Sequence, residues 1–140
     1  MLKLKILSVG KTKEKWLEEA FQEYTKRLKA SVQIETAWAK DHAQLIEWTQ
    51  RESSYLCLDP TGRLFTSEAL AHFLTQQWEK GGSRLTFVIG GAEGLPVEIK
   101  ERGNLISLSP LTFTHQITRL ILIEQIYRVI EIQKGSHYHK

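Results

Sequence analysis

Apolar and polar residues alternate at the start of the chain. Over Leu2–Val9, Lys3 and Lys5 stand between leucines, and the β-branched Ile6 and Val9 follow. A period of two residues is typical of a strand, because successive side chains of a strand point to opposite faces of the sheet. Further apolar runs of strand length predict strands at Val32–Ala39, Tyr55–Leu58, Leu85–Ile89 and Leu105–Leu108.

The segments between these strands carry apolar residues three or four positions apart, the spacing of one helix face. Asp41 and Ser67 each precede such a segment, and their short polar side chains favour the N-cap position. Gly81 and Gly82 end one helix, and Gly135 ends the last. Helices are expected at Lys11–Lys29, from Asp41 to about Glu52, from Ser67 to Gly81, in a short segment after Pro96, and at about Thr114–Gln133.

Strands and helices alternate along the chain. This order favours an α/β fold, a mainly parallel sheet with helices on both faces, and the 140 residues fit a single domain spanning 1–140. In such a sheet a ligand binds beyond the carboxyl ends of the strands. The loops Asp59–Arg63, Gly90–Leu95 and Ser109–Thr114 all follow strands, so we expect them to converge at one site.

Composition narrows the class of protein. Apolar residues make up 41% and charged residues 25%, which is typical of a globular protein and not of a disordered or fibrous one. The longest aliphatic run, Leu120–Ile123, is far shorter than the roughly 20 residues of a membrane span, and the alternating N-terminus does not fit a signal peptide. We therefore expect a cytoplasmic protein with no membrane segment, in which Cys57 is a small buried side chain. The net charge of +3 is a mild bias toward polyanions.

Two glycines, Gly90 and Gly91, directly follow a strongly apolar strand. Glycines without a Cβ let a ligand approach the backbone, although an ordinary tight turn has the same sequence. Asp59 also follows a buried strand. It can start a turn with Pro60, the interpretation we favour, or accept a ribose hydroxyl. Gly10, with Lys and Thr after it, lacks the earlier glycine of a phosphate-binding loop, so a strand-to-helix junction is preferred there.

The last predicted helix is apolar on two sides. Leu122, Ile126 and Val129 share one face, which should pack on the sheet. A helix with two apolar faces needs a second partner, and we favour a second subunit over another helix, because a chain of this length has few spare layers. The opposite stripe consists of Ile117, Leu120 and Ile121 with the ion-pair spacing of Glu124 and Arg128.

Ring and cationic side chains gather near both ends of that helix. His115 and Arg119 lie in its first turns, near the strand ends; a helix-start hydrogen bond and a solvated charge are their alternative roles. Stacking rings and positive charge after Gly135 suit an unstacked RNA base. A His-x-His metal site there lacks further ligands nearby, and a frayed terminus is the remaining alternative. The tail residues concerned are His137, Tyr138, His139 and Lys140.

Together, these pieces resemble the small bacterial SPOUT enzymes that methylate ring nitrogen N3 of a pseudouridine in large-subunit ribosomal RNA. The resemblance covers the whole chain. One departure is Thr114, where the family often has proline before the His-Gln pair. The segments are L-K-I-L-S-V-G-K-T-K-E from Leu4, I-G-G-A-E-G-L from Ile89, S-L-S-P-L-T-F-T-H-Q from Ser107, R-L-I-L-I-E-Q-I-Y-R from Arg119, and G-S-H-Y-H-K at the end.

The resemblance implies a trefoil knot in the C-terminal part, a rare exception to unknotted topology, and a homodimer with the last helix at its interface. It also implies S-adenosylmethionine as cofactor, no metal, and the ribosome or its large-subunit RNA as partner. Each site would take its cofactor from one subunit and substrate-binding residues partly from the other. The cofactor contacts carry over to Leu58, Gly90, Gly91, Leu108, Ser109, Pro110, Leu111, Thr112 and Phe113.

Individual catalytic roles are hypotheses at this point. The transfer requires loss of the N3 proton, which His139 or His137 can take near neutral pH. Arg128 or Arg119 can stabilise the developing negative imide or hold a phosphate, and His115 is a further catalytic candidate. Substrate contacts are expected from Arg119, His137, Tyr138 and Lys140.

Two other functions stay open. One is an RNA-binding or ribosome-assembly factor of the same fold without activity, which cofactor binding would distinguish from the enzyme. The other is a SPOUT methyltransferase for a different RNA, such as a transfer RNA. No appended RNA-binding domain is apparent, so free RNA would be held weakly and an assembled ribosome is the favoured substrate.

Overall fold

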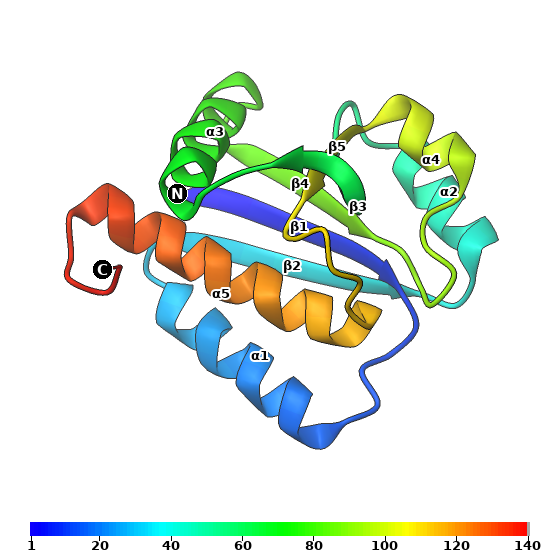
Figure 1. The fold of residues 1–140 in the computed structure, drawn as a ribbon, viewed down its shortest axis with the longest axis horizontal. Coiled ribbons are helices and arrows are strands. Elements are labelled where there is room, and N and C mark those ends of the chain that lie inside the picture. Colours follow the sequence, from blue (N-terminus) through cyan, green and yellow to red (C-terminus); the bar gives the residue numbers. More distant parts are fainter. Residues whose placement is uncertain (140) are drawn as a thin grey trace.

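The structure is a computed structural model and describes residues 1–139. Within these residues five strands and five helices alternate along the chain (Figure 1). The strands are β1 (Leu2–Val9), β2 (Val32–Ala39), β3 (Leu56–Leu64), β4 (Arg84–Ile89) and β5 (Asn104–Ser107). The helices are α1 (Lys15–Leu28), α2 (His42–Gln50), α3 (Ser67–Lys80), α4 (Val97–Arg102) and α5 (His115–Lys134).

The strands form one sheet in the order β2-β1-β4-β3-β5, and every neighbouring pair is parallel. β1 lies inside the sheet, where Lys3 pairs with Gln33 on one side and with Arg84 on the other. The predicted α/β fold with a mainly parallel sheet is therefore confirmed. The trefoil threading of the C-terminal segment stays a prediction.

Helices α1, α3 and α5 cover one face of the sheet and share a core with Ile6, Phe87 and Ile106. α5 lies between the other two helices (Figure 1). Its face of Leu122, Ile126 and Val129 is at most 1% exposed, as the helical pattern predicted. Burying each such side chain contributes about 1.5–3 kcal/mol, so this contact is a main source of stability.

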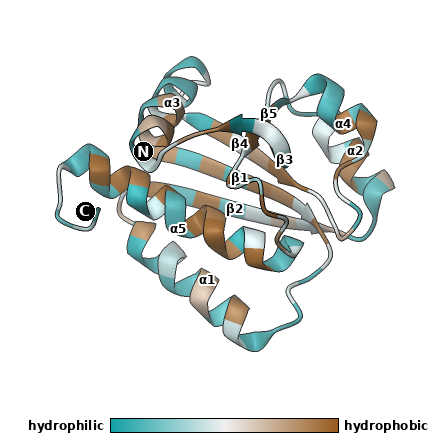
Figure 2. Ribbon diagram, in the orientation of Figure 1, coloured by the Kyte–Doolittle hydropathy of each residue, from teal (hydrophilic) through white to brown (hydrophobic). Residues whose placement is uncertain are grey.

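Helices α2 and α4 lie on the second face and bury a smaller core around Leu7, Val88 and Ile99. This core covers only the half of the face near the carboxyl ends of the strands. Toward the strand starts the same face carries Lys3, Lys5 and other polar side chains, and Figure 2 shows hydrophilic bands at the start of β1. The lysines whose alternation predicted β1 thus lie on the face of the sheet that α2 and α4 cover only in part. This is expected, because a lysine in an interior strand needs access to water.

Two predicted helix ends have the expected caps, and Thr114 provides a third cap that was not predicted. The Asp41 carboxylate accepts a hydrogen bond from the Gln44 N–H at 2.9 Å, and the Thr114 hydroxyl accepts one from the Ile117 N–H at 3.3 Å. Gly135 has a left-handed conformation with φ of 70°, which glycine adopts without strain. Thr114, which stands where related enzymes often have proline, therefore serves as an N-cap.

Two predicted helix starts are wrong. α1 begins at Lys15 and not at Lys11, because the Lys13 N–H donates to the Gln116 side chain at 2.9 Å and so stays outside the helix. α3 is capped by Thr66, whose hydroxyl accepts from the Ala69 N–H at 3.1 Å, so Ser67 is the first helical residue.

The predicted turn at residues 59–62 lies inside β3. Leu58 and Arg63 both pair with Ile106, so the residues between them form a bulge and the strand resumes beyond it. A Cβ at Gly62 would lie 2.6 Å from the Ile106 backbone nitrogen, so the bulge needs glycine at this point.

Cys57 is fully buried, and burial raises the pKa of its thiol to about 12. The thiol is therefore protonated at neutral pH, which confirms its prediction as a buried, unreactive side chain. None of the helices within residues 1–139 has the length and hydropathy needed to cross a membrane.

Candidate active site

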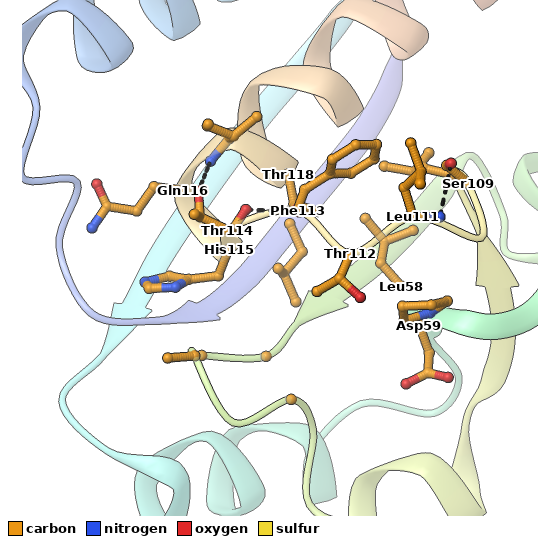
Figure 3. A pocket seen from close by; sticks show the side chains of 18 of the residues that line it. Leu58, Asp59, Ser109, Leu111, Thr112, Phe113, Thr114, His115, Gln116 and Thr118 are labelled. Carbon is orange, nitrogen blue, oxygen red and sulfur yellow. Dashed lines mark hydrogen bonds between the residues drawn. The ribbon is translucent and has the colours of Figure 1, made fainter.

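A cavity of about 760 Å³ lies at the carboxyl edge of the sheet (Figure 3). The three loops that the sequence predicted to converge all contribute to its wall, with Asp59, Gly90 and Thr112 as examples. The volume is within the usual range for a small-molecule site, and leucine and phenylalanine side chains provide an apolar wall. The edge of the sheet is thus where a ligand fits.

Nearly all predicted cofactor contacts line this cavity. The exception is Pro110, which is exposed and does not line the wall. Leu111 and Phe113 lie on the same loop, and Figure 3 shows them beside Leu58. The predicted contacts that line the cavity are Leu58, Gly90, Gly91, Leu108, Ser109, Leu111, Thr112 and Phe113.

The glycine loop after β4 folds back on itself. The Gly94 N–H donates to the Gly91 carbonyl at 3.0 Å, and a Cβ at Gly90 would lie 2.5 Å from the Gly94 carbonyl carbon. Gly90 also lines the cavity, so the approach of a ligand to this glycine stays a prediction. The missing Cβ makes room for the loop itself, which then shapes the cavity.

Gly90→Ala is expected to weaken ligand binding at this cavity by at least about tenfold and to cost about 1–3 kcal/mol of stability, because the backbone must move to admit a methyl group. Gly91→Ala is the matched control. There a Cβ would meet only ordinary contacts, 3.6 Å from the Val9 Cβ, so stability should be unchanged. Calorimetry with S-adenosylmethionine and thermal melting measure both effects. Equal behaviour of the two variants would contradict this account of the loop.

The loop between β5 and α5 is held by its own serines. The Ser107 hydroxyl donates to the Ser109 carbonyl at 2.9 Å and accepts from the Ser109 N–H at 3.2 Å. The Ser109 hydroxyl accepts from the Leu111 N–H at 3.1 Å. Together with the Thr114 cap, these bonds fix the backbone that forms one wall of the cavity.

Asp59 has the turn role that we favoured, and it also lines the cavity. Its carboxylate accepts from the Thr61 N–H at 3.0 Å and lies 3.3 Å from the Lys100 ammonium. Burial alone would raise the pKa of Asp59, but the Thr61 hydrogen bonds and Lys100 outweigh it and lower the pKa. A negative charge therefore persists at the cavity wall, where a hydroxyl group can donate to it.

His115, at the first turn of α5, also lines the cavity (Figure 3). Burial lowers the pKa of His115, and the positive charges of Arg119 and Lys13 lower it further. The imidazole is therefore neutral near pH 7 and can accept a proton. Among the catalytic candidates predicted from sequence, His115 is the one that lines the cavity.

Arg119 is 1% exposed, so its alternative role as a solvated charge is wrong. Its guanidinium donates to Ser8 at 3.0 Å and to the carbonyls of Val9 and Gly10 at 2.7 and 2.6 Å. It also lies over the Trp38 ring, 4.1 Å from the centroid. Arg119 does not line the cavity, and in the single chain its donors hold the end of β1 against α5 instead of meeting a substrate.

Arg128 and the tail residues His137, Tyr138 and His139 lie toward the other end of α5, and none of these four lines the cavity. The Tyr138 hydroxyl donates to Glu124 at 2.8 Å, and Arg128 donates to the same carboxylate at 2.8 Å. Burial raises the pKa of Tyr138, and the bond to Glu124 raises it further. His137 is exposed. The tail through residue 139 is thus folded onto α5, and the alternative of a frayed terminus is wrong for it. Lys140 lies outside the described residues.

Both ring nitrogens of His139 have partners. Arg128 lies 3.0 Å from Nδ1, and a Glu68 oxygen lies 2.6 Å from Nε2. Because a guanidinium only donates, Nδ1 accepts and the proton resides on Nε2, which donates to Glu68. In this arrangement His139 has no free nitrogen to take a proton. His139 packs beside Arg128, ten residues beyond Thr118 of the cavity wall, so about 15 Å of helix separates His139 from the cavity within one chain.

Comparison with known families decides among the chemistries that such a cavity allows. The family model described as predicted SPOUT methyltransferase matches residues 2–139. The chain belongs to the SPOUT methyltransferase family. A SPOUT methyltransferase needs a methyl donor, and the cavity at the carboxyl edge has the size and the apolar wall for one.

Individual SPOUT relatives match over their whole length. The chain is 74% identical over 140 residues to the Ribosomal RNA large subunit methyltransferase H of Protochlamydia amoebophila (strain UWE25), covering all of both chains. The proteins of the same name from Symbiobacterium thermophilum and Halothermothrix orenii are 38% and 36% identical. In both cases 99% of this chain and 100% of the relative are covered.

The cavity of this SPOUT methyltransferase includes residues that the sequence did not single out for a site. Lys13, Glu14 and Trp16 precede or begin α1, and Ile117 lies on the outer stripe of α5. Trp16 is a large apolar side chain in the first turn of α1, yet it is 58% exposed in the structure. Within residues 1–139, no group of three or more His, Cys, Asp or Glu side chains is arranged to hold a metal ion.

Proposed function

We propose that this protein transfers a methyl group from S-adenosylmethionine to N3 of a pseudouridine in large-subunit ribosomal RNA, in the cytoplasm and on the assembled ribosome. The observation that carries the proposal is the cavity formed by the three loops at the carboxyl edge. It occurs in a chain 74% identical, over its full length, to a protein named Ribosomal RNA large subunit methyltransferase H. The alternative of a binding factor without activity would not need a donor cavity of this size.

The cavity fits S-adenosylmethionine chemically. Leu58, Leu108 and Phe113 provide apolar surface for an adenine ring, and Asp59 provides an acceptor for a ribose hydroxyl. Gly90 and Gly91 shape the glycine loop, and the serine-held loop through Leu111 and Thr112 forms the facing wall. When bound, S-adenosylmethionine supplies an electrophilic methyl group, whose bond to sulfur breaks as its bond to N3 forms.

The chain has two tasks beyond binding the donor. It must hold N3 in line with the methyl group, and positioning of this kind contributes up to about 7–11 kcal/mol. It must also accept the N3 proton, because the neutral imide is a poor nucleophile. His115 is neutral near pH 7 and lines the cavity, so it is the candidate acceptor within one chain. His139 is the second candidate. It can accept the proton only after a substrate has separated it from Arg128 or Glu68.

We propose a homodimer because it brings the two ends of α5 together. The stripe of Ile117, Leu120 and Ile121 lies on the outer side of α5, and Ile117 is 37% exposed. Two copies of α5 that pack antiparallel on this stripe bring the tail of one subunit to the cavity of the other. Tyr138 would then offer a ring to the base, and Arg128 a positive charge to the imide, across the interface.

The function is tested by methyl transfer from labelled S-adenosylmethionine to whole ribosomes, free large subunits and protein-free ribosomal and transfer RNAs, followed by mapping of the modified nucleotide. We expect label on one pseudouridine of large-subunit RNA and the highest rate with assembled ribosomes. Native protein that binds S-adenosylmethionine but labels only transfer RNA would support the alternative substrate. Native protein that binds ribosomes but neither binds nor consumes S-adenosylmethionine would support the binding factor.

A further inference from the structure

A second hollow, of about 470 Å³, lies at the opposite edge of the sheet from the cavity. It occupies the half of the second face that α2 and α4 leave open. Two rows of side chains cross its floor in register, Gln33–Lys3–Arg84 and Glu35–Lys5–Thr86. A parallel sheet is normally covered on both faces, so an open, polar area on its interior strands needs a reason.

In one of these rows the lysine is paired with a carboxylate of the same chain. The Lys5 ammonium lies 2.9 Å from a Glu52 carboxylate oxygen, and the other oxygen of Glu52 accepts from the Thr86 hydroxyl at 2.8 Å. Thr86 is 8% exposed, so this cluster is a fixed part of the hollow. Lys5 therefore needs no charged partner from outside the chain.

The cations of the other row have no such carboxylate partner. Lys3 and Arg84 lie directly opposite each other on β1 and β4, and both are exposed. Within residues 1–139 neither side chain has a carboxylate within ion-pair distance. Like charges directly opposite each other on neighbouring strands destabilise a sheet. An anion between the two side chains would remove this repulsion.

The surroundings of the pair also suit an oxyanion. Uncharged donors from two strands, from α3 and from the α2–β3 loop ring the hollow, and its cations outnumber its carboxylates. The cations are Lys3, Lys5, Arg51 and Arg84, and the carboxylates are Glu35 and Glu52. The uncharged polar residues are Gln33, Ser53, Ser54, Gln77 and Asn104.

We propose that this hollow binds a backbone phosphate of the RNA substrate, held between Lys3 and Arg84, as a second anchor remote from the methylated base. The proposal rests on the proposed function, because a polynucleotide substrate carries phosphates beyond the target base. Arg84 of the hollow and Ile89 of the cavity wall lie five residues apart on β4, so the two sites lie about 17 Å apart along that strand. A separation of this size matches a contact with a different segment of a folded RNA.

The test is the salt dependence of ribosome binding by the full chain with Lys3→Gln and Arg84→Gln together. Removing the contacts to this one phosphate should weaken binding about tenfold near 0.1 M salt and reduce the slope of log K against log salt by about one. At saturating ribosomes the rate of methyl transfer should be unchanged. The melting temperature should be unchanged or higher, because a repulsion is removed. The charge-preserving variant with Lys3→Arg and Arg84→Lys should bind like the native protein.

Lys29→Gln is the matched control. Lys29 is exposed at the end of α1, on the first face of the sheet and outside the second hollow, so its loss should leave the salt slope nearly unchanged. Equal slopes for the native protein and the double variant would overturn the proposal. An effect that appears with ribosomes but not with protein-free large-subunit RNA would also overturn it, in favour of an acidic protein partner. If free inorganic phosphate at millimolar concentration abolishes the difference between the native protein and the double variant, the hollow binds small anions instead.

Failure of this proposal is distinguishable from failure of the proposed function. Binding is measured without methyl transfer, so the slopes are informative even for an inactive enzyme. If the native protein methylates ribosomes and the double variant binds them with unchanged affinity, only the proposal for the hollow is wrong. If the native protein binds RNA through the hollow but transfers no methyl group, only the proposed enzymatic function is wrong.

Discussion

Removal of residues 136–140 is expected to lower the rate of methyl transfer to ribosomes by about a hundredfold or more, because it removes the ring of Tyr138 and His139, the second candidate proton acceptor, from the proposed shared site. The affinity for S-adenosylmethionine should change by less than about twofold, because no described residue of this tail lines the cavity. The measurements are single-turnover rates at saturating donor and calorimetry with the donor alone.

The truncated chain should also fold. The deletion removes the bonds from Tyr138 to Glu124 and from His139 to Arg128, but Gly135 still ends α5. A second variant, His139→Gln, keeps the tail in place and removes only the titratable ring. Truncated protein that methylates ribosomes at the native rate would exclude the tail from the site. Loss of donor binding on truncation would mean that the tail serves the cofactor.

Ile121→Asp is expected to convert the protein from a dimer to a monomer at micromolar concentration and to reduce methyl transfer by a similar factor of about a hundred. The substitution puts an unpaired carboxylate at the centre of the outer stripe of α5, where burial in an interface costs several kcal/mol. Light scattering gives the mass, and donor calorimetry checks that each monomer keeps its cavity. Native protein that is monomeric at this concentration would overturn the dimer.

Mixed dimers test whether the site is shared between subunits. A tail-truncated chain keeps its cavity, and a chain with Gly90→Ala keeps its tail. A dimer of the two, isolated through different affinity tags, has one site with both parts intact. If the tail acts across the interface, this dimer should reach about half the native rate at a donor concentration too low to fill the Gly90→Ala cavity, a condition in which each parent dimer is much slower. Mixed dimers as inactive as both parents would mean that the tail acts within its own chain.

Much of the fold was predictable because local patterns set local geometry. The bounds of β1 and β2 followed from runs of apolar and alternating residues, and Asp41 and Gly135 marked helix ends by their chemistry. The convergence of three loops followed from the rule that parallel strands end at one edge. None of these steps needed information about which distant residues touch.

The errors at α1 and β3 arise from distant contacts. The helix at α1 starts late because Gln116, 103 residues away, binds the Lys13 N–H. β3 continues past Pro60 because Ile106 pairs with it twice. Propensity cannot include such contacts, because they arise only when segments far apart in sequence are packed together.

The candidate site divides in the same way. By itself the sequence determined the fold class, the three loops of the cavity wall and the two-sided character of the last helix, because these depend on periodicity and on residue types at the ends of elements. Only the tertiary structure decided that Arg119 is buried against β1, that His115 lines the cavity, and that the tail packs against the far half of α5. It also revealed the open half of the second face beside Lys3. The physical reason is that burial, pKa and partner choice depend on the three-dimensional surroundings of a side chain, which the order of residues along the chain does not contain.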